Sequence, residues 1–369
     1  MNKLCCVFNI PSLYRELIYN EIDNLYDCEW YFENENVDIA LFDINKLNSA
    51  SVLEHKNVIG RAYCMYGLFR KLWRRNDFDG YLMVGAPMCI SIWVLCLFLK
   101  IFHPKKKIYF WTHGWYGKES RLERIIKRTF LRLADKLFLY GNYAKNQLLK
   151  EGFNSNDLYV IHNSLSYDVQ LSLRQQMTIT DIYEKHFSIK APVLLFIGRL
   201  TPVKQLDMIV DALSILQKRG RNYNLVLVGD GSERVALEKK VESLDLTGHV
   251  WFYGPCYDEL TNAELIYNAD LCVAPGNIGL TAIHVMMFGC PAITHNDFPY
   301  QMPEFEAIKE NKTGAFFNRG DVESLAEIID RWFVTNEGCR DSVRECCYDE
   351  IDNYWTPQYQ INVFKKVIG

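Results

Sequence analysis

Residues 193–204 read Val-Leu-Leu-Phe-Ile-Gly-Arg-Leu-Thr-Pro-Val-Lys, and this stretch decides the fold of the chain around it. Its first five residues form a short apolar run that stops at a glycine, which is typical of a strand buried on both faces of a parallel sheet. Apolar residues then recur at helical spacing from 206 to 216. The stretch therefore predicts a strand, a loop that carries two cations, and a helix.

The same alternation continues on both sides of this stretch. Apolar runs that end in turns predict further strands at 225–228, 249–253, 270–274 and 292–294, and a helix from about 279 to 288. The first half shows the pattern less regularly, with expected strands at 4–8, 81–84, 107–111, 137–140 and 158–161. We therefore expect two doubly wound, Rossmann-like α/β domains: residues 1–165, a polar linker at 166–190, and residues 191–350.

The composition of the 369 residues sets limits on the class of protein. With 49% hydrophobic and 23% charged residues, the chain is expected to be a soluble globular protein, and disorder, collagen and coiled coil are excluded. The net charge of −4 argues against a nucleic-acid partner. The 12 cysteines include no C-x-x-C pair, and the sequence begins without a signal peptide. We therefore expect reduced thiols in the cytoplasm, without a zinc site.

The charge is distributed unevenly along the chain. Residues 56–150 hold 19 Lys and Arg against 5 Asp and Glu, which predicts an anionic partner for this part. Within it, residues 118–136 predict a helix whose cations stand largely off an apolar face. This pattern leaves two interpretations open: a helix on an anionic membrane surface, or a docked helix with a solvated basic face.

Residues 81–102 require a separate decision, because they are mostly apolar and Lys100 is their only charged residue. A stretch of this length could span a bilayer. However, Gly85-Ala86-Pro87 divides it into a strand and a helix. We therefore expect a buried core helix instead of a membrane span.

Ligands of such sheets bind at the carboxyl ends of the strands, so the loops after the strands are the candidate sites. Gly198, Arg199 and Lys204 place backbone N–H groups and two cations where a pair of phosphates could bind; the alternative is a solvated helix start. Val228-Gly229-Asp230-Gly231 is a tight turn whose glycines would let a ligand approach the backbone.

As an ordered series, these features resemble the C-terminal domain of family-four (group 1) retaining glycosyltransferases of the GT-B fold. The series consists of Gly198-Arg199 with Lys204, the 228–231 turn, Phe252-Tyr253-Gly254, residues 275–291 and Lys312-Thr313-Gly314. It covers about residues 190–335, whereas the N-terminal half is similar in architecture and at Thr112-His113-Gly114. The resemblance implies two domains that face a central cleft, with a C-terminal helix at 351–369 that crosses back to the first domain.

The resemblance also implies a site for a nucleotide-diphosphate sugar as the donor, and a UDP-sugar is the first candidate. It implies no metal or other cofactor. It assigns the diphosphate to Arg199, Lys204, Gly279, Leu280 and Thr281; the nucleotide to Gly198, Gly229, Gly231, Gly254 and His284; and the donor sugar to Gly276, Asn277 and Ile278. His113 is implied as the catalytic residue that faces the donor sugar.

The sequence departs from the family pattern at several positions. The family's two glutamates are replaced by Gly276, which cannot hold a sugar, and by His284, which either bonds a ribose hydroxyl or packs as a helical histidine. No glycine-rich loop follows the first strand. Asp77 and Asp79 have the spacing of a metal motif from another glycosyltransferase fold, but we interpret them as turn residues.

The activity that the resemblance implies is transfer of a hexosyl group, with retention, to a hydroxyl of a glycan or lipid-linked oligosaccharide in surface polysaccharide or glycoconjugate synthesis. Together with the basic segment, it places the protein in the cytoplasm, on the inner face of the cell membrane. Two alternatives stay open: a non-catalytic nucleotide-sugar-binding protein, and a GT-B epimerase.

Overall fold

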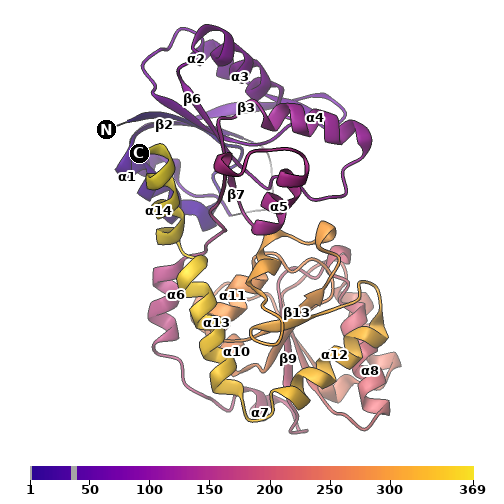
Figure 1. The fold of residues 1–369 in the computed structure, drawn as a ribbon. Helices are drawn as coiled ribbons and strands as arrows, with labels where there is room; N and C mark the ends of the chain where they lie inside the picture. The colour runs from indigo at the N-terminus through magenta and orange to yellow at the C-terminus, as the bar shows by residue number, and fades with distance from the viewer. Residues whose placement is uncertain (1, 35–39) are drawn as a thin grey trace. The chain divides into compact units, whose positions relative to one another are not determined.

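A computed structural model describes residues 2–34 and 40–369, and the chain divides into two compact units (Figure 1). The first unit consists of Met1–Leu165 together with Thr356–Gly369, and the second is Ser166–Trp355. Each unit is built on one sheet with helices on both faces, so the α/β fold with two Rossmann-like domains is confirmed.

The sheet of the first unit has the order β4-β3-β2-β1-β5-β6-β7-β8, and its strands are parallel except for the β3–β4 pair. The strands are β1 (Lys3–Val7), β2 (Asp27–Glu33), β3 (Ala50–Ile59), β4 (Ala62–Tyr66), β5 (Gly80–Val84), β6 (Lys107–Thr112), β7 (Lys136–Leu139) and β8 (Leu158–Val160). The order of the strands reverses between β1 and β5. This reversal is the point where sheets of this class open a crevice for ligands.

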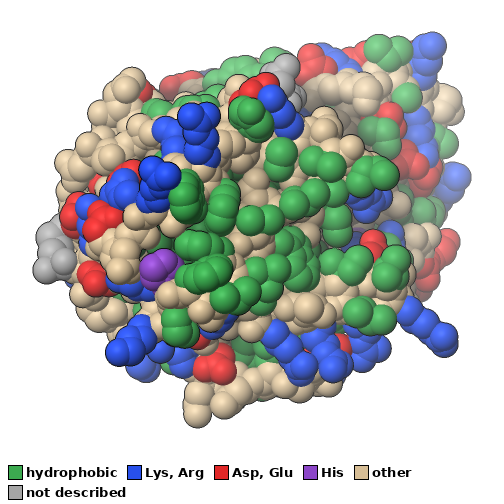
Figure 2. All heavy atoms as spheres, turned by 90° about the horizontal axis from the view of Figure 1, so that it is seen from above, with side chains coloured by type: hydrophobic (Ala, Val, Ile, Leu, Met, Phe, Trp, Pro, Cys, Tyr) green, Lys and Arg blue, Asp and Glu red, His purple; other side chains and the backbone are tan. Residues whose placement is uncertain are grey.

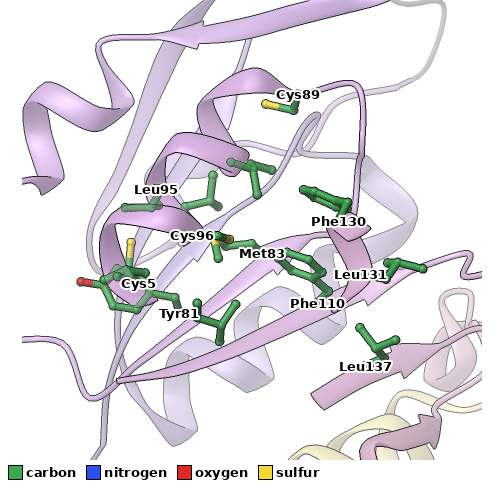
Figure 3. Packing of buried hydrophobic residues seen from close by; sticks show 14 of the residues in the cluster. Cys5, Tyr81, Met83, Cys89, Leu95, Cys96, Phe110, Phe130, Leu131 and Leu137 are labelled. Carbon is green, nitrogen blue, oxygen red and sulfur yellow. The ribbon is translucent and has the colours of Figure 1, made fainter. Parts of the chain in front are cut away.

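Helices bury both faces of this sheet, which explains the continuous apolar run of β1. Leu4 and Cys6 pack with α1 (Glu16–Leu25) and α14 (Pro357–Ile368), which lie side by side. Cys5 and Val7 pack on the opposite side with α2 (Leu68–Leu72), α3 (Ile90–Phe102), α4 (Arg121–Leu131) and α5 (Asn142–Lys150). Figure 3 shows this second core, in which Met83 and Phe110 of the sheet meet Cys96 and Phe130 of the helices.

The apolar stretch at 81–102 forms β5 and α3, as expected, but α3 is buried on one side only. Leu95 and Leu99 are buried, whereas Ile101 and Phe102 are 68% and 65% exposed. The expectation of a buried core helix is therefore wrong for the outer side of α3. Within residues 2–34 and 40–369, no helix has both the length and the apolar character needed to cross a bilayer.

The sheet of the second unit is parallel throughout, with the order β11-β10-β9-β12-β13-β14. Its strands are β9 (Val193–Ile197), β10 (Asn224–Val228), β11 (Val250–Gly254), β12 (Leu271–Ala274), β13 (Ala292–His295) and β14 (Gly314–Phe317). Its helices include α8 (Asp207–Lys218), α9 (Arg234–Ser243), α10 (Glu259–Asn268), α11 (Thr281–Met287), α12 (Val322–Thr335) and α13 (Arg340–Tyr354). The strand order reverses between β9 and β12, so the loops after these two strands flank the ligand position expected for this topology.

Two boundaries differ from those expected. Residues 166–190, expected as a polar linker, belong to the second unit and form α6 (Tyr167–Arg174) and α7 (Ile182–His186), both in contact with α10. Gln170 Nε2 donates to Glu259 Oε1 at 2.7 Å, which fixes α6 to the second unit. Residues 351–369 are not one helix, because α13 ends at Tyr354 and α14 begins at Pro357. The proline at the first position of α14 explains the break, since it cannot continue the hydrogen bonding of the preceding helix.

Candidate active site

In the second unit, the expected diphosphate and sugar residues come together on two neighbouring loops. Residues 198–204 follow β9 and residues 275–280 follow β12. Lys204 joins the two loops: its Nζ donates to Asn277 O at 2.7 Å and to Asn277 Oδ1 at 2.9 Å. Burial, together with the charge of Arg199, lowers the pKa of Lys204 to about 8, and the Glu304 carboxylate partly opposes this shift. Arg199 itself is exposed at the surface.

Gly276 stands where the family has its first glutamate, and the packing of the loops excludes a side chain there. A Cβ atom at Gly276 would lie 2.0 Å from the carbonyl oxygen of Val203. The Gly276 N–H donates to the carbonyl of Lys204 at 3.0 Å, which holds the two loops in contact. The close contact between the two loops thus leaves no room for a carboxylate side chain at position 276. Gly276 can offer a ligand only its backbone groups.

The turn after β10 packs in the same close manner. A Cβ atom would lie 1.9 Å from Gly198 O at Gly229, and 2.3 Å from Leu200 O at Gly231. The Gly229 N–H donates to Gly254 O at 2.8 Å, so this turn is also tied to the end of β11. The expectation that these glycines open the backbone to a ligand is wrong on the side of the missing Cβ, which the loop after β9 occupies.

The start of α11 is held from inside the unit. Thr281 Oγ1 donates to Ile197 O at 3.1 Å, and the Ile278 N–H donates to Gln301 Oε1 at 3.0 Å. Ile278 is buried and its N–H is engaged within the unit, and its expected contact with the donor sugar stays a prediction. Gly279 has a φ of +55° and directs the chain into Leu280 and α11.

His284 has a carboxylate partner that the sequence did not indicate. Its Nε2 lies 2.9 Å from Glu259 Oε1, at the start of α10. Burial raises the pKa of Glu259, but the hydrogen bond and charge of His284, together with hydrogen bonds from Gln170 and Asn262, outweigh it, so the pKa is lowered overall. Because α10 and α11 meet only through the fold, no local signal connects Glu259 with His284.

The first unit contains a cavity of about 590 Å³ at the reversal of its own sheet. Residues that follow β1, β5, β6 and β7 line it, among them Arg15, Gly85, His113 and Tyr140. Thr112 Oγ1 donates to Gly85 O at 2.9 Å and accepts from the Gly114 N–H at 3.2 Å, which positions the loop that carries His113.

His113 is a neutral imidazole in this cavity. Burial, and then the charges of Arg15 and Lys127, lower its pKa to about 3. Its Nδ1 is buried and has no hydrogen-bond partner among the residues that the structure describes, and its ring centroid lies 4.6 Å from that of Tyr140. Such a group can exchange hydrogen bonds with a sugar hydroxyl, but it carries no charge near neutral pH.

A second cavity, of about 930 Å³, lies in the second unit. It lies at the amino ends of β9, β10 and β12, lined by Val193, Asn224 and Asp270, and none of the expected site residues borders it. Ligands of doubly wound sheets bind at the opposite ends of the strands, so volume alone does not mark this cavity as the active site.

Asp77 and Asp79 are engaged as structural groups. Asp77 pairs with Lys3 and Arg75, each at 2.7 Å, and its hydrogen bond from Arg75 holds its pKa well below the usual range. Asp79 Oδ2 accepts from the Lys3 N–H at 2.9 Å. In the described part of the chain, no group of three or more His, Cys, Asp and Glu side chains is arranged to hold a metal ion.

Comparison with known proteins gives concordant results. Residues 179–345 match the family described as "Glycosyl transferases group 1". The amylovoran biosynthesis glycosyltransferase AmsD of Erwinia amylovora is 24% identical over 217 residues, which cover 58% of this chain and 59% of that protein. The GDP-mannose-dependent alpha-(1-6)-phosphatidylinositol dimannoside mannosyltransferase of Mycobacterium tuberculosis is 34% identical over 113 residues, 30% of this chain and 29% of the relative.

The aligned segments thus span less than two thirds of either relative. The crystal structure of Anabaena HepE in complex with UDP superimposes over the full length of both chains with a TM-score of 0.70 at 16% identity, a likeness of fold. The family match therefore covers most of the second unit, and the chain as a whole shares the GT-B fold of the solved glycosyltransferase structures.

Proposed function

We propose that the protein transfers a hexosyl group from a nucleotide-diphosphate sugar to a hydroxyl of a glycan acceptor. The first candidate for this donor is a UDP-sugar. The observation that carries this proposal is the junction of the 198–204 and 275–280 loops, where Arg199 and the partly buried Lys204 supply positive charge at the ligand edge of a family-matched unit. In the transfer, the acceptor oxygen bonds to the anomeric carbon, the bond from that carbon to the β-phosphate oxygen breaks, and the acceptor proton leaves with the released diphosphate.

The leaving diphosphate is stabilised by the chain's own groups in this proposal. Arg199 and Lys204 offset its charge, and the backbone at Gly279, Leu280 and Thr281 supplies N–H donors, so that no divalent ion is required. Gly198, Gly229, Gly231, Gly254 and His284 border the nucleotide, and the backbone of Gly276 and Asn277 borders the sugar. The neutral His113 hydrogen-bonds the transferred sugar, and the configuration of the anomeric carbon is retained.

The proposal is tested by calorimetric titration of the full chain with UDP and a panel of UDP-hexoses in EDTA. Arg199→Ala should weaken UDP binding at least tenfold, because a charge-assisted hydrogen bond contributes about 1.5–3 kcal/mol. Arg331→Ala is the matched control, an exposed arginine on α12 of the same unit. Equal UDP affinity in both variants would remove the diphosphate assignment, and hydrolysis or transfer of a bound UDP-hexose separates an enzyme from a binding protein.

We further propose that the acceptor is lipid-linked and that the protein works in the cytoplasm on the inner face of the cell membrane. The support is the outer face of α3 and α4, where Phe102, Leu122 and Ile125 are each at least 65% exposed. Figure 2 shows hydrophobic side chains gathered on this face with Lys and Arg side chains around them. Exposed apolar groups within a basic rim suit an anionic lipid surface.

A further inference from the structure

Arg15 is a buried arginine whose charge is not offset by an acid. It ends the short 3-10 helix η1 (Leu13–Arg15) after β1 and is only 9% exposed. Within the described residues, no carboxylate lies within ion-pair distance of its guanidinium. Arginine is almost never buried without such a partner, because removing the charge from water costs several kcal/mol in proteins.

The groups around Arg15 orient the guanidinium without neutralising it. Its Nη1 lies 3.5 Å from Tyr19 Oη, and its Nη2 donates to Tyr140 Oη. The guanidinium carbon lies 5.2 Å from the centroid of the Trp111 ring. Its Nε is buried and has no hydrogen-bond partner in the described part of the chain. Arg15 lines the 590 Å³ cavity, and one donor of its guanidinium group has no partner within the described part of the chain.

The other charges of this cavity leave a positive excess. Arg61, Lys118 and Lys127 also line it, against Glu119 and Glu123. The two acids are used within the protein: Glu119 accepts from Lys127 Nζ at 2.7 Å and from two backbone N–H groups, and Glu123 completes the capping box of α4 with Ser120. The cavity walls are aromatic, with Trp111, Tyr116 and Tyr140.

We infer that this cavity binds an acidic sugar, whose carboxylate or phosphate is held by Arg15 while its ring lies against the aromatic walls. A planar guanidinium fork matches either oxyanion, and a pocket of 590 Å³ falls within the range of sugar-sized ligand sites. Resting on the proposed function, the acidic sugar is the acceptor, because Arg199 and Lys204 serve the donor diphosphate.

The inference is tested on the full chain by ligand-observed NMR with three probes: methyl glucuronide, glucose 6-phosphate and neutral methyl glucoside. The two acidic probes should bind at least tenfold more tightly than the neutral one. Arg15→Met should abolish this preference, and Arg15→Lys should retain part of it. The melting temperature of Arg15→Met should equal or exceed that of the wild type, since an apolar side chain removes an uncompensated buried charge.

Equal binding of methyl glucoside and methyl glucuronide by the wild type would overturn the inference, even if Arg15→Met did not fold. So would an unchanged preference in the Arg15→Met protein. Competition with UDP identifies the source of the oxyanion: if UDP displaces methyl glucuronide, Arg15 serves the donor phosphates and the acceptor assignment is wrong. If UDP does not bind at all, the proposed function fails. Binding of methyl glucuronide that depends on Arg15 would still support the assignment of an anion-binding site in this cavity.

Discussion

At the scale of single residues, Lys204 joins the 198–204 and 275–280 loops and also supplies a charge to the proposed diphosphate site. Its ammonium group bonds Asn277 and carries a pKa lowered to about 8 by burial and Arg199. A diphosphate binds the protonated form, so its affinity should fall as pH rises through this pKa. Between pH 7 and pH 9 the protonated fraction drops about tenfold, and calorimetry should record a loss of about that size in UDP affinity.

The control for this pH dependence is Lys204→Gln, which removes the titrating group. Its UDP affinity should be lower than that of the wild type at pH 7 and nearly constant up to pH 9. A wild-type affinity that stays constant over the same range would show that the lysine charge does not contribute to diphosphate binding.

His284 gives a second prediction at this scale, which depends on its pairing with Glu259. If the ring bonds a ribose hydroxyl, His284→Ala should weaken UDP binding about fivefold, the effect of roughly 1 kcal/mol for one net hydrogen bond. The wild type should also distinguish UDP from its 2′- or 3′-deoxy analogue, and the variant should not. A lowered melting temperature with unchanged discrimination would identify a packed histidine.

At the scale of secondary structure, the strands that could be predicted are those buried on both faces. The bounds of β9 agree with the apolar run that ends at Gly198, because burial on both sides requires an unbroken run. The hairpin of β3 and β4 gave no such signal, since it is an edge pair in which most side chains are partly or fully exposed. Likewise, the apolar composition of α3 did not indicate that side chains on its outer side, such as Ile101 and Phe102, are exposed to solvent.

That outer side provides a prediction for α3 and α4. The protein should bind vesicles that contain anionic lipid and not neutral ones, and it should leave them in 1 M salt, where the Debye length falls from about 10 Å to about 3 Å. Ile101→Asp with Phe102→Asp should reduce vesicle binding at least tenfold without lowering the melting temperature, because both side chains are exposed. Sedimentation with vesicles measures this effect.

The control for this surface is Val235→Asp, which changes an apolar residue of α9 that is 60% exposed in the second unit. It should bind anionic vesicles as the wild type does. If both variants bind equally well, the apolar face of α3 does not contact lipid.

At the scale of the whole molecule, the two units repeat one plan, with a reversal of strand order beside β1 in the first and β9 in the second. The proximity of the 198–204 and 275–280 loops could be predicted because each directly follows an apolar strand of the sheet. The cavity of the first unit could not, because Arg15 and Tyr140 are separated by 125 positions and meet only when β1 and β7 enter one sheet. The same holds for Glu259 and His284. Local patterns thus identified the loops, but not the side chains that tertiary folding brings to them.

The two units also share a response to acid, since each contains a histidine whose pKa is lowered by burial. The pKa of His113 is lowered to about 3 by burial, Arg15 and Lys127, and that of His295 to about 4 by burial and Arg319. Unfolded histidines titrate near pH 6.5, so between these values the unfolded chain binds more protons than the folded chain. The stabilisation is therefore complete above pH 6.5 and is lost as pH falls toward 4. Each histidine should contribute a slope of up to about 1.4 kcal/mol per pH unit.

Urea unfolding at pH 7.5, 5.5 and 4.5 measures this loss, with the two units followed separately by hydrogen exchange. His113→Gln should flatten the pH dependence of the first unit and leave that of the second unchanged, and His295→Gln should do the opposite, because each histidine lies in the core region of a different sheet. Parallel pH profiles in the wild type and both variants would show that the pKa of each histidine is the same in the folded and unfolded states. In that case the pKa of His113 would lie near 6.5, and its ring would be protonated in mildly acidic solution.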